Sequence, residues 1–405
     1  MKLLIAIPAY NEEQSIEPII QRSLAAREYI TAMSPVDEVD IAVVSDGSTD
    51  RTLEIAKAHD REIKVIGFEH NRGYGAAIQE AWKQSDAELL GFLDADGTCD
   101  PRFFATLCRV IETDHADVAI GCRMNKESKM PALRRVGNTI FATLLGLFSS
   151  TRVRDTASGM RVVRRASLDK LEPLPTGMHF TPAMSARAML DRNLKMHEID
   201  MPYAEREGRS KLSVVRDGLR FLKVIVEAAF LYRPERPLSI LASACLAGAV
   251  LLMIEPSIYY LTHRAVAEWM IYRFIVSNLA GVAAFLLFSA SYVTARIVAM
   301  TLQNGNPRRS ATSVTRALLH SGSFWVVPLL LMFFGGLLVL PSFLELVRTG
   351  ATYEHWSRFI AMSFLFSLAI ILLTTRACDY ILDLLESRLE FLRRRTLERQ
   401  EKVAA

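Results

Sequence analysis

The sequence lacks the signatures of several common protein classes. Its five cysteines form no Cys-x-x-Cys pair, and an odd, scattered set argues against both a disulfide framework and a zinc site. The eight histidines give no His-Glu-x-x-His spacing, and neither a Gly-x-Ser-x-Gly elbow nor a Walker loop is present. With 48 basic and 44 acidic residues, the net charge of +4 is too small for a nucleic-acid-binding footprint.

A cleavable signal peptide is not expected either. The first apolar run, Leu3 to Ile7, is too short for a signal core and is interrupted by Pro8. We therefore expect the first domain to stay in the reducing compartment where it is made. The mean hydropathy of +0.19 is high for a soluble enzyme, and the apolar residues concentrate after Pro237. This distribution predicts a soluble front and a membrane-embedded back.

Short apolar runs alternate with amphipathic segments in the first 121 residues. The runs predict strands at Leu3–Pro8, Ile41–Ser45, Lys64–Phe68, Leu89–Asp94 and Val118–Gly121. The segments between them predict helices at Glu12–Ala26, Thr49–Ala58, Gly75–Gln84 and Pro101–Glu112. This alternation is typical of an α/β domain with a mostly parallel, doubly wound sheet, which binds ligands beyond the carboxyl ends of its strands.

The rest of the chain predicts membrane association. Two segments, Leu133–Phe148 and Leu212–Tyr232, are apolar and basic at helical spacing, which favours helices on a bilayer surface over ordinary packing on the core. Four longer apolar stretches follow, each near the length of a spanning helix: Leu238–Ile254, Phe274–Ala295, Phe324–Leu344 and Phe359–Thr375.

Charges near these stretches predict an orientation. The middle loop carries Arg308, Arg309 and Arg316 without an acidic residue, and the tail carries Arg393, Arg394 and Arg395. The positive-inside rule then places the N-terminal domain and the C-terminus in the cytoplasm. Three charges at the borders of the apolar stretches, Glu255, Arg296 and Arg376, are best interpreted as snorkelling side chains.

An Asp-x-Asp pair follows one predicted strand. Asp94 and Asp96 come after the apolar run Leu89–Leu93, which fixes two carboxylates at an edge of the sheet. A hard divalent cation prefers such oxygens, and a departing nucleoside diphosphate needs its charge neutralised. Alone, this pair is as well explained by a turn with acidic caps.

Three further motifs precede the Asp-x-Asp pair in a fixed order. They read Ile-Pro-Ala-Tyr-Asn-Glu-Glu, Val-Ser-Asp-Gly-Ser-Thr-Asp and Asn-Arg-Gly-Tyr-Gly-Ala-Ala, at residues 7–13, 44–50 and 71–77. Together the four motifs resemble the family 2 glycosyltransferases of the GT-A fold. The resemblance implies a nucleotide-sugar site formed by Pro8, Tyr10, Glu12, Asp46, Arg72 and Asp94. It also implies that Asp94 and Asp96 bind Mg²⁺ or Mn²⁺.

Motifs further along resemble the polyprenyl-phosphate branch of that family, the dolichol-phosphate mannosyltransferases and bactoprenol glucosyltransferases. These are Gly-Cys-Arg at 121–123, Arg-Val-Gly-Asn at 135–138, Asp-Thr-Ala-Ser-Gly-Met-Arg at 155–161 and Glu-Gly-Arg-Ser-Lys-Leu at 207–212. An acceptor phosphate is already anionic, so it needs cations rather than a strong base. The candidate phosphate-binding residues are Arg123, Arg135, Arg161, Arg209, Ser210 and Lys211. The candidate catalytic residues are Asp96, Arg123, Asp155 and Lys211, although Asp155 fits a turn cap equally well.

Two positions depart from the family pattern. Thr98 stands where many relatives have glutamine, and Tyr74 replaces a common lysine. A metal ligand and a donor-phosphate contact are therefore in question at these positions.

The sequence thus predicts four parts: a GT-A domain at 1–210, an interfacial helix and connector at 211–236, four spans at 237–385 and a basic tail at 386–405. The expected reaction is metal-dependent, inverting transfer of one hexose from a GDP-mannose- or UDP-glucose-class donor to dolichyl or undecaprenyl phosphate. Membrane lipids are expected partners, and association into a homo-oligomer is left open. The alternatives are a processive polysaccharide synthase, whose Gln-x-x-Arg-Trp motif is absent, and a non-catalytic nucleotide-sugar-binding scaffold or flippase.

Overall fold

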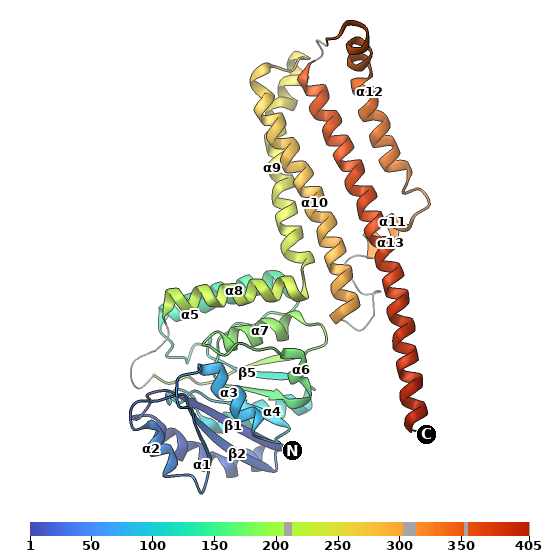
Figure 1. Cartoon of the computed structure of the whole chain (residues 1–405). Helices are drawn as coiled ribbons and strands as arrows, with labels where there is room; N and C mark the ends of the chain where they lie inside the picture. The colour runs from blue at the N-terminus through green and yellow to red at the C-terminus, as the bar shows by residue number, and fades with distance from the viewer. Residues whose placement is uncertain (206–212, 303–312, 352–354, 405) are drawn as a thin grey trace. The chain divides into compact units, whose positions relative to one another are not determined.

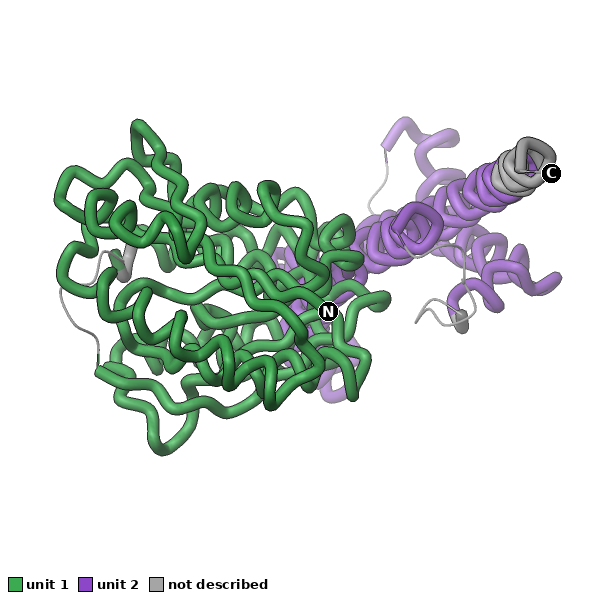
Figure 2. Tube along the Cα trace, turned by 90° about the horizontal axis from the view of Figure 1, so that it is seen from below, with its two compact units in different colours: residues 1–232 green, residues 233–405 purple. Residues whose placement is uncertain are grey.

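The chain forms two compact units. A computed structural model describes residues 1–205, 213–302, 313–351 and 355–404. The first unit is Met1–Tyr232 and the second is Arg233–Ala405, coloured separately in Figure 2. The first unit holds all the strands of the described residues, and the second is helical.

The first unit is built on one seven-stranded sheet with the order β3-β2-β1-β4-β6-β5-β7. The strand pairs β1–β2, β2–β3, β1–β4 and β5–β7 are parallel, whereas β6 is antiparallel to both of its neighbours. The strands are β1 (Lys2–Ala9), β2 (Glu38–Ser45), β3 (Lys64–Gly67), β4 (Leu89–Phe92), β5 (Val118–Cys122), β6 (Arg161–Arg164) and β7 (Met196–Asp200). The predicted α/β class with a mostly parallel sheet is confirmed.

Helices cover both faces of this sheet (Figure 1). They are α1 (Ile16–Met33), α2 (Thr52–Lys57), α3 (Tyr74–Lys83), η1 (Pro101–Phe103), α4 (Phe104–Thr113), α5 (Ala132–Phe148), η2 (Arg165–Ser167), α6 (Leu168–Leu171), α7 (Phe180–Leu190) and α8 (Val214–Tyr232). Side chains alternate along β1, so that Leu3, Ile5 and Ile7 join the core under α1 and α4. Leu4 and Ala6 point the other way, into the core under α3 and α7.

The helix α1 begins four residues later than the sequence predicts. Residues Glu12 to Ser15 form a turn instead, in which the backbone N–H groups of Ser15 and Ile16 donate to the Glu12 carbonyl oxygen. Asn11 just before this turn has a positive φ of 52°, which asparagine tolerates better than most residues. The turn keeps Glu12 outside the helix, on a loop that follows β1.

Helix α7 lies between the sheet and the pair formed by α5 and α8 (Figure 1). On α8, Ile225, Ala229 and Tyr232 are buried in the core shared with α5 and α7. Another stripe of the same helix remains exposed, including Leu219 and Phe230 at 64% and 45%. Packing on the core therefore uses one face of α8 and leaves a second apolar face uncovered.

Helix α5 repeats this arrangement. Its Leu145 and Phe148 are buried against α7 and α8, whereas apolar side chains on its other side are more than half exposed. These are Leu133, Val136, Ile140 and Leu147. Two neighbouring helices thus both present an apolar stripe outward, as expected of helices that lie on a bilayer.

The second unit contains α9 (Glu235–His263), η3 (Glu268–Met270), α10 (Ile271–Leu302), α11 (Ser313–His320), α12 (Val326–Thr349) and α13 (Trp356–Ala404). Four segments of the described residues are long and apolar enough to cross a membrane: Glu235–His263, Glu268–Leu302, Val326–Thr349 and Trp356–Leu392. Three of them contain a predicted apolar stretch, and Val326–Thr349 overlaps the predicted Phe324–Leu344, so the prediction of four apolar helices is confirmed.

The snorkelling interpretation is wrong for Arg296. Its side chain is only 2% exposed, because three carboxylates of α13 surround the guanidinium group. Its Nη1 donates to Asp379 Oδ1 at 2.8 Å, and its Nη2 donates to Asp383 Oδ1 at 3.0 Å and to Glu386 Oε2 at 2.9 Å. Arg376 also pairs with Asp379, at 3.4 Å. Arg296 thus joins α10 to α13, whereas the Arg376 pair lies within α13.

Replacing Phe180 by alanine should destabilise the first unit. Phe180 is fully buried, and its ring centroid lies 5.8 Å from those of both Trp82 and Phe92. Loss of this ring leaves a cavity that costs about 3–5 kcal/mol, so the slowest amides of β1 should exchange at least about 100-fold faster. Hydrogen exchange read by mass spectrometry on the full chain measures this directly.

The matched control is Tyr29→Ala, which removes an aromatic ring that is 46% exposed. It should change β1 exchange by less than about threefold, since surface substitutions cost about 0.5 kcal/mol or less. Equal exchange in Phe180→Ala and wild type would contradict the proposed core.

Candidate active site

A cavity of about 430 Å³ opens in the first unit, where the parallel strands end. Lining residues follow the carboxyl ends of β1, β2, β4 and β5, and others come from α5 and α8. Its charged lining residues are Glu12, Asp46, Asp94, Asp96, Arg123, Arg134 and Arg220. The lining thus contains two sets of charged groups, called below the acidic side (the carboxylates) and the basic side (the arginines).

Asp94 and Asp96 lie just after β4 and both line this cavity. Each accepts a hydrogen bond from a hydroxyl group: Tyr74 Oη donates to Asp94 Oδ1 at 2.7 Å, and Thr98 Oγ1 donates to Asp96 Oδ1 at 2.6 Å. Burial, together with the Asp94 carboxylate, raises the pKa of Tyr74 well above its usual value, so its hydroxyl is a donor at neutral pH. Two hard oxygen ligands side by side fit Mg²⁺ or Mn²⁺.

Gly159 is required where it approaches Asp94. A Cβ atom at residue 159 would lie 1.9 Å from Asp94 Oδ2, so any larger residue would displace the carboxylate. Asp94 is therefore held between the Tyr74 hydroxyl on one side and the Gly159 backbone on the other.

Three of the residues predicted to bind the nucleotide sugar, Pro8, Tyr10 and Glu12, line the cavity. Tyr10 is 37% exposed, and Glu12 Oε2 accepts a hydrogen bond from Ser15 at 3.1 Å. Arg72 does not line the cavity, because its guanidinium group lies over the Phe68 ring, 4.4 Å from the centroid.

Asp46 lines the cavity but uses its carboxylate to fix a loop. Its Oδ1 accepts from the Arg72 backbone N–H at 2.6 Å, and its Oδ2 accepts from that of Gly73 at 2.9 Å. Gly73 has a φ of 106°, and a Cβ there would lie 2.5 Å from the Thr176 carbonyl oxygen, so glycine is needed at this turn. Asp46 thereby sets the start of α3, which carries Tyr74.

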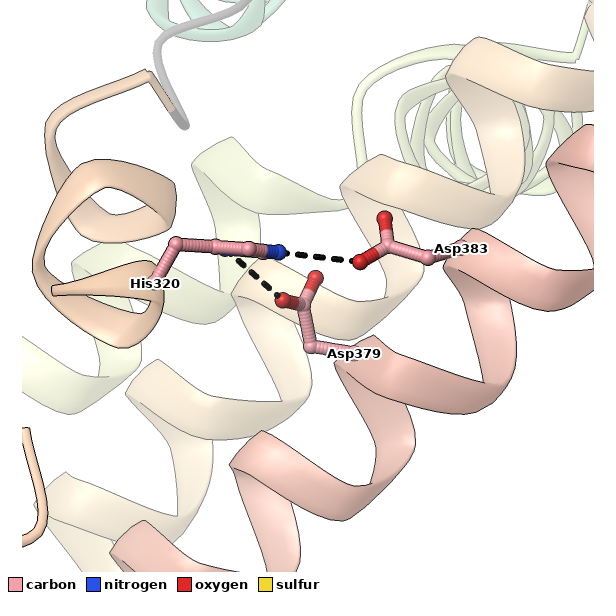
Figure 3. A group of neighbouring side chains, drawn as sticks. All are labelled: His320, Asp379 and Asp383. Carbon is pink, nitrogen blue, oxygen red and sulfur yellow. Dashed lines mark hydrogen bonds and ion pairs between the residues drawn. The ribbon is translucent and has the colours of Figure 1, made fainter. Parts of the chain in front are cut away.

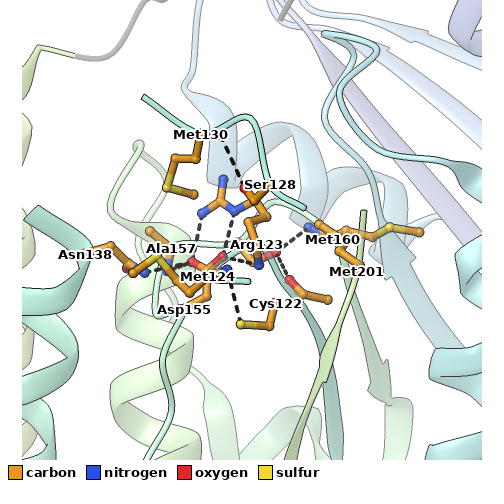
Figure 4. A network of polar contacts seen from close by, with 12 residues as sticks. Cys122, Arg123, Met124, Ser128, Met130, Asn138, Asp155, Ala157, Met160 and Met201 are labelled. Carbon is orange, nitrogen blue, oxygen red and sulfur yellow. Dashed lines mark hydrogen bonds and ion pairs between the residues drawn. The ribbon is translucent and has the colours of Figure 1, made fainter. Parts of the chain in front are cut away.

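An ion pair between Arg123 and Asp155 organises the basic side (Figure 4). Asp155 is fully buried and accepts from Arg123 Nε at 2.7 Å, from Arg123 Nη2 at 2.9 Å and from the Arg123 backbone N–H at 3.0 Å. Asn138 of α5 donates to the same carboxylate at 3.2 Å. The pair thus joins the end of β5, the chain before β6 and α5.

The Arg123 guanidinium group and the Asp155 carboxylate both stay charged. Burial disfavours the charged forms, but the attraction between the two groups outweighs it, raising the pKa of Arg123 and lowering the pKa of Asp155. Arg123 also lies over the Tyr203 ring at 5.4 Å. Because Arg123 lines the cavity and Asp155 does not, Asp155 acts on the cavity only through Arg123. The predicted catalytic role of Asp155 thus stays a prediction, in which Asp155 acts by positioning Arg123.

Two of the arginines predicted to bind phosphate lie outside the cavity lining. Arg161 is fully buried and donates to the carbonyl oxygens of Ser158 and Thr156, at 3.0 and 2.9 Å. Burial lowers its pKa to about 10, so it is still charged at neutral pH. Arg135 donates to the backbone carbonyls of Asn125 and Ser128, at 3.3 and 3.2 Å. Both side chains hold the backbone near the site rather than facing a ligand.

Two arginines that the sequence assigned only to membrane-surface helices line the cavity instead. Arg134 of α5 and Arg220 of α8 reach it together with Phe221. The adjacent Arg134 and Arg135 look equivalent in the sequence, and only the rotation of α5 separates them. The other predicted phosphate-binding residues, Arg209, Ser210 and Lys211, lie outside the described residues.

A second group of potential metal ligands in the described residues is found in the second unit (Figure 3). His320 lies between Asp383, 2.9 Å from its Nε2, and Asp379, 3.5 Å from its Nδ1. The two ring nitrogens face different carboxylates, whereas a metal takes one nitrogen of a ring. Since Arg296 also pairs with both aspartates, we assign this group to an ion-pair network that holds α11 on α13.

Replacing Asp155 by asparagine should destabilise the first unit, because it leaves the Arg123 charge buried without its partner. Breaking such a pair costs about 3–5 kcal/mol. The double variant Arg123→Gln with Asp155→Asn removes both charges and should recover most of this loss. Hydrogen exchange of β5 and α5 in the full chain reports both changes. A double variant that is less stable than Asp155→Asn would contradict this account of the pair.

Comparisons with known proteins identify the family of the chain. The model of the family described as Glycosyl transferase family 2 matches residues 4–172. A dolichyl-phosphate hexose transferase from Haloferax volcanii is 33% identical over 231 residues, which cover 56% of this chain and 92% of that protein. The low-salt glycan biosynthesis hexosyltransferase Agl6 from the same organism is 31% identical over 228 residues, but this chain spans only 53% of its length.

Among solved structures, glucosyl-3-phosphoglycerate synthase from Mycobacterium tuberculosis with bound UDP aligns with 56% of this chain and 80% of its own. The TM-score is 0.44 and the identity 18%. A dolichyl-phosphate beta-glucosyltransferase from Drosophila melanogaster is 32% identical over 231 residues, covering 53% of this chain and 70% of that protein. The chain belongs to glycosyl transferase family 2.

Proposed function

We propose that this chain transfers a single hexose, with inversion, from a nucleoside-diphosphate sugar of the GDP-mannose or UDP-glucose class to a dolichyl or undecaprenyl phosphate. The observation that carries the proposal is the divided charge of the cavity. Carboxylates after the strand ends suit a cation-bound diphosphate, and three arginines in the same lining suit a second phosphate. A transfer between two phosphate-bearing substrates needs both sides.

The donor occupies the acidic side in this proposal. Pro8, Tyr10 and Glu12 line the part of the cavity next to β1 and receive the nucleoside. Asp94 and Asp96 hold Mg²⁺ or Mn²⁺ on the diphosphate. When bound, that cation neutralises the charge that develops on the departing diphosphate.

The acceptor phosphate occupies the basic side, held by Arg123, Arg134 and Arg220. Its oxygen is already anionic near neutral pH, so no general base is required, and the arginines position it for attack on the anomeric carbon. Attack from the side opposite the leaving diphosphate inverts the configuration. Arg123 is the most rigid of the three, since Asp155 holds its guanidinium group through two hydrogen bonds. Arg209, Ser210 and Lys211 remain proposed contacts.

The lipid chain of the acceptor enters from the membrane surface. The exposed apolar stripes of α5 and α8 lie on the helices that bring Arg134 and Arg220 to the cavity. If these stripes rest on the bilayer, a phosphate headgroup reaches the arginines while its tail stays in lipid. We propose that this surface, the C-terminus and the site face the cytoplasm, on the charge asymmetry of the loops.

The names of the relatives support the acceptor class. The relative from Haloferax volcanii with 92% coverage is a dolichyl-phosphate hexose transferase, and a dodecaprenyl-phosphate galacturonate synthase from Rhizobium johnstonii is 27% identical over 243 residues.

Sugar transfer into lipid tests the proposal. Purified full-length protein is incubated with radiolabelled UDP- or GDP-sugars, Mg²⁺ or Mn²⁺ and polyprenyl phosphate, and the organic extract is counted. We expect one donor to label an acid-labile lipid that carries a single hexose. The label should fall by at least about 100-fold with chelator or with Asp96→Asn, since loss of a principal charge stabiliser costs that much.

The outcomes separate the rival functions. A polymer in place of a single sugar would favour a processive synthase. Nucleotide-sugar binding without any lipid product, for every donor and both polyprenols, would overturn the enzymatic proposal and favour a binding role.

Replacing Gly159 by alanine should reduce this transfer by about 10–100-fold, because the new Cβ displaces the Asp94 carboxylate. The matched control is Gly137→Ala on α5, where a Cβ meets nothing within 4 Å. Initial rates with the same donor and acceptor measure both variants. Equal rates for Gly159→Ala and Gly137→Ala would show that Asp94 need not be held in place.

A further inference from the structure

Each of the two aspartates proposed to bind the cation is held by one hydroxyl group. Tyr74 donates to Asp94 Oδ1 at 2.7 Å, and Thr98 donates to Asp96 Oδ1 at 2.6 Å. These two donors are the same two residues at which the sequence departs from its family's pattern. The departures therefore share one physical effect, since both place a hydroxyl hydrogen on a carboxylate.

The Tyr74 hydroxyl is rigidly placed. Its ring packs edge-on against Phe92 and Phe180, with centroids 6.5 and 6.4 Å apart. Its backbone follows Gly73, whose N–H is held by the Asp46 carboxylate. Because both the ring and the adjacent backbone of Tyr74 are held, its hydroxyl group stays in one place. It therefore fixes the position of the Asp94 carboxylate.

The Thr98 hydroxyl is equally constrained. Thr98 is 2% exposed, and its backbone N–H donates to the same Asp96 oxygen at 3.3 Å. Its carbonyl oxygen accepts from the Ala204 N–H at 2.9 Å, which ties residue 98 to the chain after β7. Because threonine is branched at Cβ, its χ1 angle is restricted, and the hydroxyl stays directed at Asp96.

We propose that Tyr74 and Thr98 are positioning residues that hold Asp94 and Asp96 in the orientation a divalent cation requires. Neither residue ligates the cation; each fixes one oxygen of a carboxylate and so leaves the group in one orientation. Partners of this kind change metal affinity by about 10–100-fold when removed. The proposal rests on the cation site of the proposed function.

Direct cation binding tests it without using turnover. Mn²⁺ is titrated into the purified full-length protein with UDP, and separately with GDP, and unbound Mn²⁺ is counted by electron paramagnetic resonance. Tyr74→Phe and Thr98→Val remove one hydroxyl each and nearly keep the shape. Each should raise the Mn²⁺ dissociation constant by about 10-fold, and the double variant by about 100-fold, because the two hydroxyls act on different ligands.

Three variants serve as controls. Thr98→Ser keeps a hydroxyl group. If the hydroxyl donor matters rather than the methyl group, the Mn²⁺ dissociation constant of this variant should stay within about threefold of the wild-type value. Tyr232→Phe removes a phenol hydroxyl that donates to the Lys170 carbonyl oxygen, and Thr31→Val removes an aliphatic hydroxyl that donates to the Glu28 carbonyl oxygen. Neither contact involves the cavity, so Mn²⁺ binding should be unchanged in both.

A kinetic measurement separates positioning from damage to the fold. In Tyr74→Phe and Thr98→Val, the Mn²⁺ concentration for half-maximal transfer should rise about 10-fold while kcat at saturating Mn²⁺ stays within about threefold. A misfolded protein would instead lose kcat at every Mn²⁺ concentration. That loss, without a shift in the direct titration, would overturn the positioning role.

The Asp96→Asn variant distinguishes the two proposals. If it loses Mn²⁺ binding while Tyr74→Phe and Thr98→Val bind as wild type does, the cation site stands and the positioning role is wrong. If Asp96→Asn binds Mn²⁺ as tightly as wild type, the cation site is elsewhere and both proposals are overturned.

Discussion

The buried ion pair between Arg123 and Asp155 is the interaction on which the second half of the site depends. The strand ends alone place the acidic side, because parallel strands bring their carboxyl ends to one edge. On the basic side, Arg123 follows the end of β5, whereas Arg134 and Arg220 come from two helices far apart in the sequence. Asp155, which also accepts from Asn138 of α5, joins the end of β5 to α5. Both charges survive burial only because each compensates the other.

Side chains on the acidic side are also held in place by their neighbours. Asp46 fixes the loop before α3, α3 fixes Tyr74, and Tyr74 fixes Asp94. The first and last of these links are hydrogen bonds to buried or half-buried groups, so each is costly to leave unmade. A cation site assembled in this way has little freedom to rearrange, which lowers the cost of ordering it when a ligand binds.

The second unit uses buried charge for a different purpose. Arg296 lies among Asp379, Asp383 and Glu386, so that one guanidinium group joins α10 to α13. Arg316 and His320 of α11 pair with the same helix. Charges at the ends of apolar helices need partners or water, and here they have partners. The network fixes how these helices pack without forming a separate reactive centre.

The sequence by itself determined the alternation of the first strands and helices, the four apolar helices and the carboxylates after β4, because these follow from local periodicity and chain order. It missed β6 and β7, since neither short segment shows a regular apolar alternation. Only the tertiary structure decided which arginines face the cavity. Arg134 and Arg135 differ by one step of rotation about α5, and Arg161 is buried by segments distant in sequence. Helix rotation and burial depend on long-range packing, which a local pattern does not encode.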